Sequence, residues 1–284
     1  MQIQNKEISI TNGIIKRASL VEERFEDVEN PELFIKELKE LKNKPDIFTF
    51  IQRLPDLEPK YNYYMEKESI AAIKITTFED WWMNKVKKVL RRRVRKSQQL
   101  GVEVKSANFD DEFVKGMVSI FNETPIRQGR YFWHYGKDFE TIKEEFSKFL
   151  FREEQIGAYY NGELIGFVFL THADRYTILM QFISKIEYRK FSTNNALMAK
   201  VVEICVKKKI PYLVYGKWGR STFAEFKDNF GFDKYDIIRY YIPLTYKGKI
   251  LIKLRLHNGI KQILPNKLFD LLFNLREKYY SYKY

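Results

Sequence analysis

Cysteine, histidine and long apolar runs are scarce in this chain of 284 residues, and each shortage excludes a class of site or protein. Cys205 is the only cysteine, which excludes an internal disulfide and a cysteine-rich zinc site, and its place on an apolar helix face predicts a core residue. The three histidines are scattered, so we expect no metal site. No run is long and apolar enough to span a membrane, and the N-terminus is polar. We therefore expect a cytoplasmic protein, with peripheral contact to the inner face of the membrane as an open alternative.

Acidic residues are outnumbered by basic ones, and the formal net charge is +13. Such a balance implies an anionic partner, which can be nucleic acid, a phosphate-bearing cofactor or lipid headgroups. The excess is concentrated between Lys85 and Lys96, where eight of twelve residues are basic and none is acidic. Val86, Leu90 and Val94 recur there at helical spacing, and like charges repel on such a helix. The segment is either an ordinary solvated helix face or a binding surface for tRNA, a nucleotide-linked substrate or a membrane.

The order of predicted elements indicates an α/β chain with a substantial core. From Val102 the patterns read strand, helix, helix, hairpin, strand, helix, strand, helix, strand, with Asn161-Gly162 at the hairpin turn. We expect an α/β (α+β) fold, a mixed sheet flanked by helices, preceded by one continuous helix over Trp81–Gly101. Three segments are predicted: an α/β portion, 1–100, that extends the main domain or is a degenerate companion half; a main domain, 101–245; and a basic amphipathic helical tail, 246–284. The tail docks on the protein itself or on a membrane interface.

Three stretches carry a resemblance to a known family. "RRRVRKSQQLGVEV" resembles the segment that opens the catalytic half of Fem-like peptidyl and amino acyltransferases, a branch of the GNAT acyltransferase superfamily. "GAYYNGELIGFVFL" resembles their central hairpin, and "STFAEFKDNFGF" resembles their late helix, in which a lysine follows a phenylalanine. The resemblance covers roughly residues 80–245, a span typical of one domain. It implies a GNAT-like sheet with a splayed pair of central parallel strands.

The resemblance also implies a function. The leading expectation is an N- or O-acyltransferase that moves an acyl group from acetyl-CoA or another acyl-CoA to an amine or hydroxyl of a cell-envelope or polysaccharide precursor. A Fem-like aminoacyl transferase, which takes aminoacyl-tRNA as donor, is one alternative. A non-catalytic protein on a GNAT scaffold, binding nucleic acid or an anionic membrane surface, is another.

The donor side of the expected site follows from the resemblance. GNAT enzymes bind the donor pyrophosphate at a helix N-terminus, and the matching loop here is "EYRKFSTNNAL", which departs from the family pattern because it has no glycine. Strand amides would hold the donor carbonyl and the developing oxyanion, and Tyr215 would protonate the departing thiolate. Lys217 and Lys227 are expected to face the substrate. The donor-binding residues predicted are Phe182, Ile183, Ser184, Arg189, Lys190, Ser192, Thr193, Asn194 and Asn195.

The acceptor side is expected in "NETPIRQGRYFWHYGKDF", a stretch with neither strand alternation nor amphipathic helical spacing. Glu123 or His134 would act as the base, and arginines would grip phosphate or carboxylate groups. Aromatic side chains would form the wall of the acceptor pocket. The opposing interpretation is a packed loop whose arginine and histidine side chains satisfy backbone carbonyls. The substrate-binding residues predicted in this stretch are Arg127, Arg130, Trp133 and Tyr135.

Overall fold

The computed structural model describes residues 1–127, 129–148, 150–218 and 222–258. These residues form two compact units, each taken by itself below. Unit 1 combines Met1–Ser69 with residues 236–258, and unit 2 is Ile70–Tyr235. Two strands, β5 (Tyr64–Lys74) and β13 (Asp233–Pro243), begin in one unit and end in the other. The three segments predicted from the sequence stay predictions.

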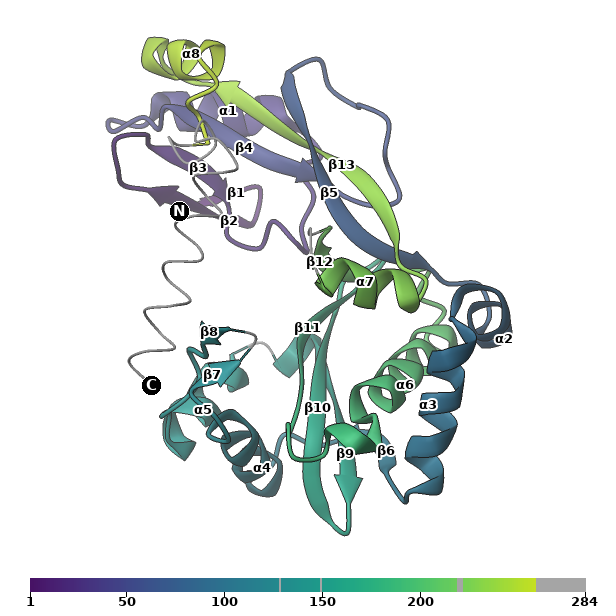
Figure 1. Ribbon diagram of the computed structural model, residues 1–284. Coiled ribbons are helices and arrows are strands. Elements are labelled where there is room, and N and C mark those ends of the chain that lie inside the picture. Colours follow the sequence, from purple (N-terminus) through teal and green to yellow (C-terminus); the bar gives the residue numbers. More distant parts are fainter. Residues whose placement is uncertain (128, 149, 219–221, 259–284) are drawn as a thin grey trace. The chain divides into compact units, whose positions relative to one another are not determined.

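Unit 1 is a sheet covered by a helix. Its strands follow the order β1 (Gln2–Ile3), β2 (Lys6–Thr11), β3 (Arg17–Leu20), β4 (Ile47–Gln52) and β13, with only the β3–β4 pair parallel. Helix α1 (Pro31–Glu40) packs on it, since Phe34 stacks on Phe48 at 5.5 Å between ring centroids. Phe50 and Tyr240 extend this aromatic core, and α8 (Tyr246–Lys253) follows β13 (Figure 1).

Unit 2 contains a mixed sheet in the order β5, β12 (Tyr212–Lys217), β11 (Thr177–Ser184), β10 (Glu163–His172), β9 (Glu153–Tyr160) and β6 (Glu103–Ala107). The β11–β12 pair is parallel and the other pairs are antiparallel. Asn161 and Gly162 both have positive φ, at 50° and 82°, as the predicted hairpin turn requires. The predicted mixed α/β sheet is confirmed.

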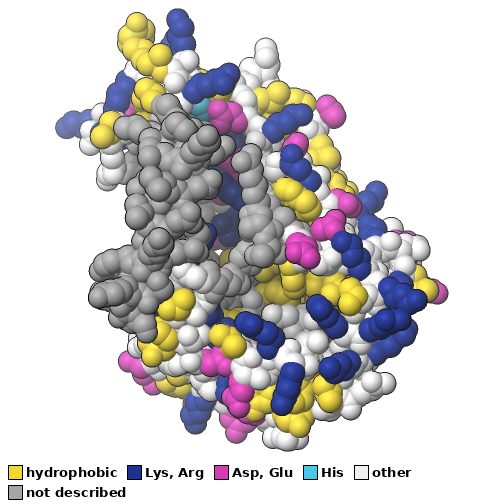
Figure 2. Space-filling model, viewed as in Figure 1, with side chains coloured by type: hydrophobic (Ala, Val, Ile, Leu, Met, Phe, Trp, Pro, Cys, Tyr) yellow, Lys and Arg dark blue, Asp and Glu magenta, His cyan; other side chains and the backbone are white. Residues whose placement is uncertain are grey.

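Helices cover both faces of this sheet. Helices α3 (Lys88–Gln99) and α6 (Thr193–Lys207) bury Leu90 and Leu197 against Ile165 and Val168 on one face. Helices α4 (Asp111–Phe121) and α5 (Phe139–Ser147) pack on Phe167 on the other face. Figure 1 shows α3 and α6 side by side, away from α4 and α5. Lys and Arg side chains gather over α3 in Figure 2. Short elements complete the unit: α2 (Phe78–Asp80), η2 (Leu150–Arg152), η3 (Arg189–Phe191) and α7 (Thr222–Asn229).

The helix predicted over Trp81–Gly101 is interrupted. A π-helix, η1 (Trp81–Lys85), precedes α3, and Val86 and Lys87 between them are extended, with ψ of 129° and 140°. The cause is tertiary. The Trp81 ring donates to the Phe230 carbonyl at 2.9 Å, and the Lys87 amide donates to the Asn229 carbonyl at 3.2 Å. The C-terminal end of α7 and the residue that follows it therefore hold this break. Gly101 ends the helical region at φ 86°, as predicted.

Two further sequence predictions concern the loop and the tail. The stretch after α4, predicted to be irregular, contains a small hairpin of β7 (Ile126–Arg127) and β8 (Arg130–Tyr131). The amphipathic part of the predicted tail, 259–284, lies outside the described residues. Within the described part of the chain, no helix is both long and apolar enough to cross a membrane.

Candidate active site

Strands β11 and β12 separate soon after they begin. Their pairing consists of Thr177 with Leu213 and Ile178 with Val214. Each strand then has a β-bulge in its pairing with its other neighbour. Strand β11 has an extra residue opposite Val168–Leu170 of β10, and β12 has an extra residue opposite β5. Beyond Ile178, the β12-facing edge of β11 has no strand partner among the described residues. This opening, which we call the splay, confirms the predicted pair of splayed parallel strands.

Aromatic rings line the splay. Phe182 of β11 and Tyr215 of β12 meet edge to face at 6.1 Å, and Phe226 of α7 contacts both rings at 5.8 and 6.3 Å. Burial raises the pKa of Tyr215 to about 12. The Tyr215 hydroxyl therefore stays protonated at neutral pH and is a weaker acid than an exposed tyrosine.

Lys227 of α7 is a buried cation beside Tyr215, and its side chain is only 6% exposed. Its Nζ lies 4.9 Å from the centre of the Tyr215 ring and donates to the Lys217 carbonyl at 2.6 Å. Burial lowers the pKa of Lys227, and no carboxylate pairs with it in the described chain. A buried cation without an anion is costly, so this position favours a ligand atom that carries or develops negative charge. The Lys217 side chain itself is exposed.

The loop after β11 leads into the N-terminus of α6. Arg189 and Lys190 are exposed on η3, and Ser192 adopts the left-handed conformation, with φ 56° and ψ 34°. Ser192 thus takes the backbone geometry that a glycine would accept at lower cost. Its carbonyl accepts from the Asn195 amide at 2.9 Å, and its side chain does not cap the helix.

Two polar side-chain atoms at this N-terminus are buried and lack a hydrogen-bond partner in the described chain: Thr193 Oγ1 and Asn194 Oδ1. Thr193 is 2% exposed. Gly166 of β10 allows this approach, because a Cβ there would lie 2.8 Å from Thr193 Cγ2 and 3.0 Å from Ser184 Cβ. The first backbone N–H groups of a helix lack intrahelical acceptors, and the Thr193 hydroxyl can also donate, so these groups fit a phosphate. Asn194 Oδ1 is an acceptor and does not contribute to that fit. Sequence reasoning missed Gly166, because its role depends on a contact with a helix 27 residues later.

Glu123, a predicted base, has both carboxylate oxygens engaged. Oε2 accepts from Arg127 at 2.9 Å and from the Ile186 amide at 2.7 Å, while Oε1 accepts from the Glu187 amide at 2.9 Å. Arg127 also donates to the carbonyls of Ile120 and Ser184, at 2.7 and 3.0 Å. The pair therefore ties the end of α4 to the end of β11. This arrangement matches the packed-loop interpretation for Arg127, and the catalytic role of Glu123 stays a prediction.

His134, the other predicted base, lies in the core beneath the loop. Its ring stacks on Phe121 at 4.4 Å and 9°, and it contacts Phe132 and Phe146. Burial, and to a lesser extent the nearby Lys137 charge, lowers the pKa of His134 to about 4, although Glu145 opposes the shift. Its Nδ1 is buried and has no hydrogen-bond partner among the described residues. The ring is therefore neutral at pH 7, and burial makes it a weaker base than an exposed histidine.

The remaining loop residues are more exposed. Arg130 lies on the surface, and Trp133 is 64% exposed with Lys137 Nζ 3.4 Å from its ring centre. Tyr135 is partly buried. The structure brings together two groups of predicted residues. One group is Glu123, Arg127 and Ser184, and the other is Phe182, Tyr215 and Lys227. The expectation that Trp133 and Tyr135 form the pocket wall stays a prediction.

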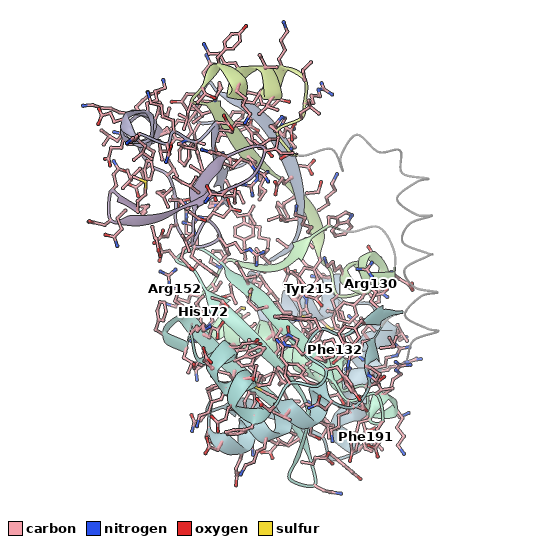
Figure 3. The ribbon with its side chains drawn as sticks, turned by 90° about the vertical axis from the view of Figure 1, so that its left-hand side faces the viewer. Arg130, Phe132, Arg152, His172, Phe191 and Tyr215 are labelled. Atoms are coloured by element: carbon pink, nitrogen blue, oxygen red, sulfur yellow. The ribbon has the colours of Figure 1, made fainter. Side chains whose placement is uncertain are left out.

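Two other features lie outside this site. Figure 3 shows His172 well separated from Arg130 and Tyr215, and its ring nitrogens contact Thr177 and Glu154. Cys205 is fully buried, and burial raises the pKa of its thiol to about 12. Across the described ranges, no cluster of three His, Cys, Asp or Glu side chains is arranged to hold a metal ion.

Comparison with solved structures establishes the fold. FemX superposes with a TM-score of 0.59 at 12% identity, over 88% of this chain and 86% of that one. The C-terminal domain of a putative lysylphosphatidylglycerol synthetase from Agrobacterium fabrum gives 0.57 at 13% identity, over 88% and 84%. L-PGS from Bacillus licheniformis gives 0.54 at 15%, over 82% and 80%. Identities this low establish the fold alone.

Comparison of sequences assigns the family. No curated protein matches the chain. The sequence model of the acetyltransferase (GNAT) domain matches residues 84–228, about half of the chain, and this range includes the splay, the α6 N-terminus and the Glu123 loop. The chain therefore belongs to the acetyltransferase (GNAT) domain family.

Proposed function

We propose that this protein transfers an acyl group from a phosphate-bearing donor to an amine or hydroxyl acceptor at the splay. One observation carries the proposal. Among the described residues, the β12-facing edge of β11 beyond Ile178 has no strand partner, and Phe182 on it contacts Tyr215, beside which Lys227 is buried without a carboxylate partner. An extended donor arm can pair with a free strand edge, as peptides do with exposed strands. A buried cation can stabilise the charge that develops on the carbonyl oxygen.

The transfer would proceed by direct attack. The acceptor nitrogen or oxygen forms a bond to the donor carbonyl carbon, and the bond from that carbon to the leaving sulfur or oxygen breaks. Backbone amides of Phe182 and Ser184, which alternate with the amides directed to β10, would hold the oxyanion together with Lys227. Neutral His134 or Glu123 receives the acceptor proton, and Tyr215 gives its proton to the leaving group.

We propose acyl-CoA as the leading donor. The N-terminus of α6, with Thr193, Asn194 and Asn195, would take a donor phosphate, and Arg189 and Lys190 supply positive charge beside it. The Tyr215 hydroxyl can donate a hydrogen bond to the sulfur of a thiolate leaving group. The acceptor proposed is an amine or hydroxyl on a cell-envelope or polysaccharide precursor, which rests on the Fem-like resemblance.

Aminoacyl-tRNA is the second donor candidate. Two observations favour it: the fold is shared with FemX and L-PGS, and eight basic residues lie between Lys85 and Lys96. An aminoacyl ester carries the same carbonyl chemistry and also presents phosphate groups. The two donors differ in how much nucleic acid must be bound, so a binding experiment separates them.

Isothermal titration of the full chain with acetyl-CoA, coenzyme A and charged tRNA tests the proposal. Binding of acetyl-CoA that is weakened by Thr193→Val, with the exposed Lys36→Met as a matched control, supports the acyl-CoA assignment. Binding of charged tRNA alone moves the donor to aminoacyl-tRNA. If neither donor binds at millimolar concentration and no acyl transfer occurs on a panel of amines and alcohols, the scaffold is non-catalytic and the proposal fails.

A further inference from the structure

A strongly basic surface on unit 2 carries cations that have no carboxylate partner among the described residues. We call it the α3 surface; it lies on η1 and α3 and consists of Met83, Lys88, Val89, Arg92, Arg93, Arg95 and Lys96. Two neighbouring cations are engaged: Lys87 pairs with Asp228 at 2.7 Å, and Arg91 donates to the carbonyls of Trp82 and Met83. Within the described chain, no carboxylate pairs with the five cations of the α3 surface. These charges repel one another and are available to an anionic partner.

Apolar side chains stand among these cations. Met83 is 57% exposed and Val89 is 49% exposed. Met83 lines a small hollow of about 140 Å³ whose other lining residues are all basic: Lys88, Arg91, Arg92 and Arg95. An exposed methionine side chain surrounded by cations is not stabilised by contact with water. It is stabilised if the surface meets a partner that is both anionic and apolar.

A larger groove lies next to this hollow, and Arg95 lines both. It lies between α3 and α6 and has a volume of about 470 Å³, within the range of sites that bind small molecules. Phe78 and Trp82, stacked at 5.7 Å, are part of its wall, and Lys200 on its rim pairs with Glu203 at 2.9 Å. The rest of the apolar lining is aliphatic: Val94, Val102, Val104, Ala196 and Ala199.

We propose that the α3 surface binds an anionic phospholipid bilayer, with lipid phosphates on the α3 cations and apolar lipid groups against Met83, Val89 and the groove. Juxtaposed cations and apolar side chains are the features that hold a helix in a membrane interface. Single-stranded nucleic acid instead stacks its bases on open aromatic faces. Here the rings of Phe78 and Trp82 stack on each other, and aliphatic side chains make up most of the remaining groove lining. The inference concerns where the enzyme is held and does not depend on the donor.

Co-sedimentation of the full chain with phospholipid vesicles tests this surface. We expect binding to vesicles of phosphatidylglycerol and phosphatidylcholine, and little binding to phosphatidylcholine alone. Arg92→Glu/Arg95→Glu should weaken binding at least tenfold, since each cation near an anionic surface contributes and each reversal adds repulsion. The matched control, Lys36→Glu/Lys39→Glu on the exposed side of α1, makes the same change in net charge and should retain most binding.

A second variant probes the apolar contribution. Met83→Ser/Val89→Ser leaves every charge in place and alters only exposed positions, so its melting temperature should be unchanged while vesicle binding weakens severalfold. If the α1 control lost as much vesicle binding as Arg92→Glu/Arg95→Glu, net charge alone would explain the loss and the proposal would be overturned. The proposal would also be overturned if the chain did not bind vesicles and instead bound tRNA in a way that requires Arg92 and Arg95. The surface would then be a nucleic-acid site.

Discussion

The substitution Glu123→Gln separates two roles for a residue at the centre of the candidate site. The carboxylate accepts three hydrogen bonds, from Arg127 and from the amides of Ile186 and Glu187. A glutamine at this position offers one oxygen and one NH₂ group. The NH₂ group must therefore face a donor, whichever way the amide is turned. Arg127, whose side chain is 13% exposed, also loses its carboxylate partner.

The expected magnitude follows from these contacts. Hydrogen bonds to charged groups contribute about 1.5–3 kcal/mol each, and we expect a loss of that order for the substitution as a whole. For a protein of this size the melting temperature would fall by roughly 3–12 °C. The backbone at Ile186 and Glu187 would shift with it, raising the donor KM more than it lowers kcat. If Glu123 were instead the base that takes the acceptor proton, kcat would fall by about 10²–10⁴.

Scanning calorimetry and steady-state kinetics on the same preparations decide between these roles. Glu187→Gln is the matched control: it removes one exposed carboxylate from the same loop, and its side chain makes no hydrogen bond recorded in the structure. The control should melt like the parent chain. An unchanged melting temperature for Glu123→Gln, with kcat reduced a hundredfold or more, would refute the positioning role and establish the base.

Three further predictions follow from buried groups. Lys227→Met removes a buried cation that has no carboxylate partner in the described chain. The rate of acyl transfer should therefore fall by about 10²–10³, while the melting temperature stays within a few degrees or rises. A large fall in melting temperature would mean that Lys227 is structural. His134 has a folded-state pKa of about 4, against 6.5 for an ordinary histidine, so the unfolded chain binds more protons between these two pH values. The free energy of unfolding therefore decreases as the pH falls from 6.5 to 4, by about 3 kcal/mol over the whole range. Urea unfolding at about pH 7.5 and pH 5 should show a smaller loss for His134→Phe, and equal losses would contradict the assignment. Gly166→Ala should destabilise the chain by about 1–3 kcal/mol and weaken donor binding, because its Cβ would overlap Thr193; an unaltered donor affinity in calorimetry would separate Gly166 from the donor site.

The sequence predicted those parts of the fold that local patterns encode. The helix–strand order after Val102, the Asn161-Gly162 turn and the stop at Gly101 all depend on neighbouring residues, and each is confirmed. The splay was inferred from the resemblance, since the register between β11 and β12 leaves no trace in either strand's own pattern. The interruption at Val86 was missed because it depends on hydrogen bonds to Asn229, the last residue of α7, and to Phe230, more than 140 positions away.

The candidate site was predicted unevenly for the same reason. The composition of the loop after α4 indicated an unusual segment, and its Arg127 does donate a hydrogen bond to Glu123. Their further partners, the backbone of Ser184, Ile186 and Glu187, lie about 60 positions away and were not foreseeable from periodicity. The absence of glycine after β11 was visible in the sequence. That a serine would adopt the left-handed conformation there could be seen only in the structure.

The occupied amides after β11 restrict where a donor phosphate can lie. The amides of Ile186 and Glu187 donate to Glu123 and are not free for phosphate oxygens. The carboxylates of Glu123 and Glu187 would also repel a phosphate placed there. At the other end of the loop, where α6 begins, the Thr193 hydroxyl can donate and has no hydrogen-bond partner in the described chain. We therefore propose that the donor phosphate approaches the α6 end of the loop and that its acyl arm runs from there along the edge of β11 that has no strand partner among the described residues.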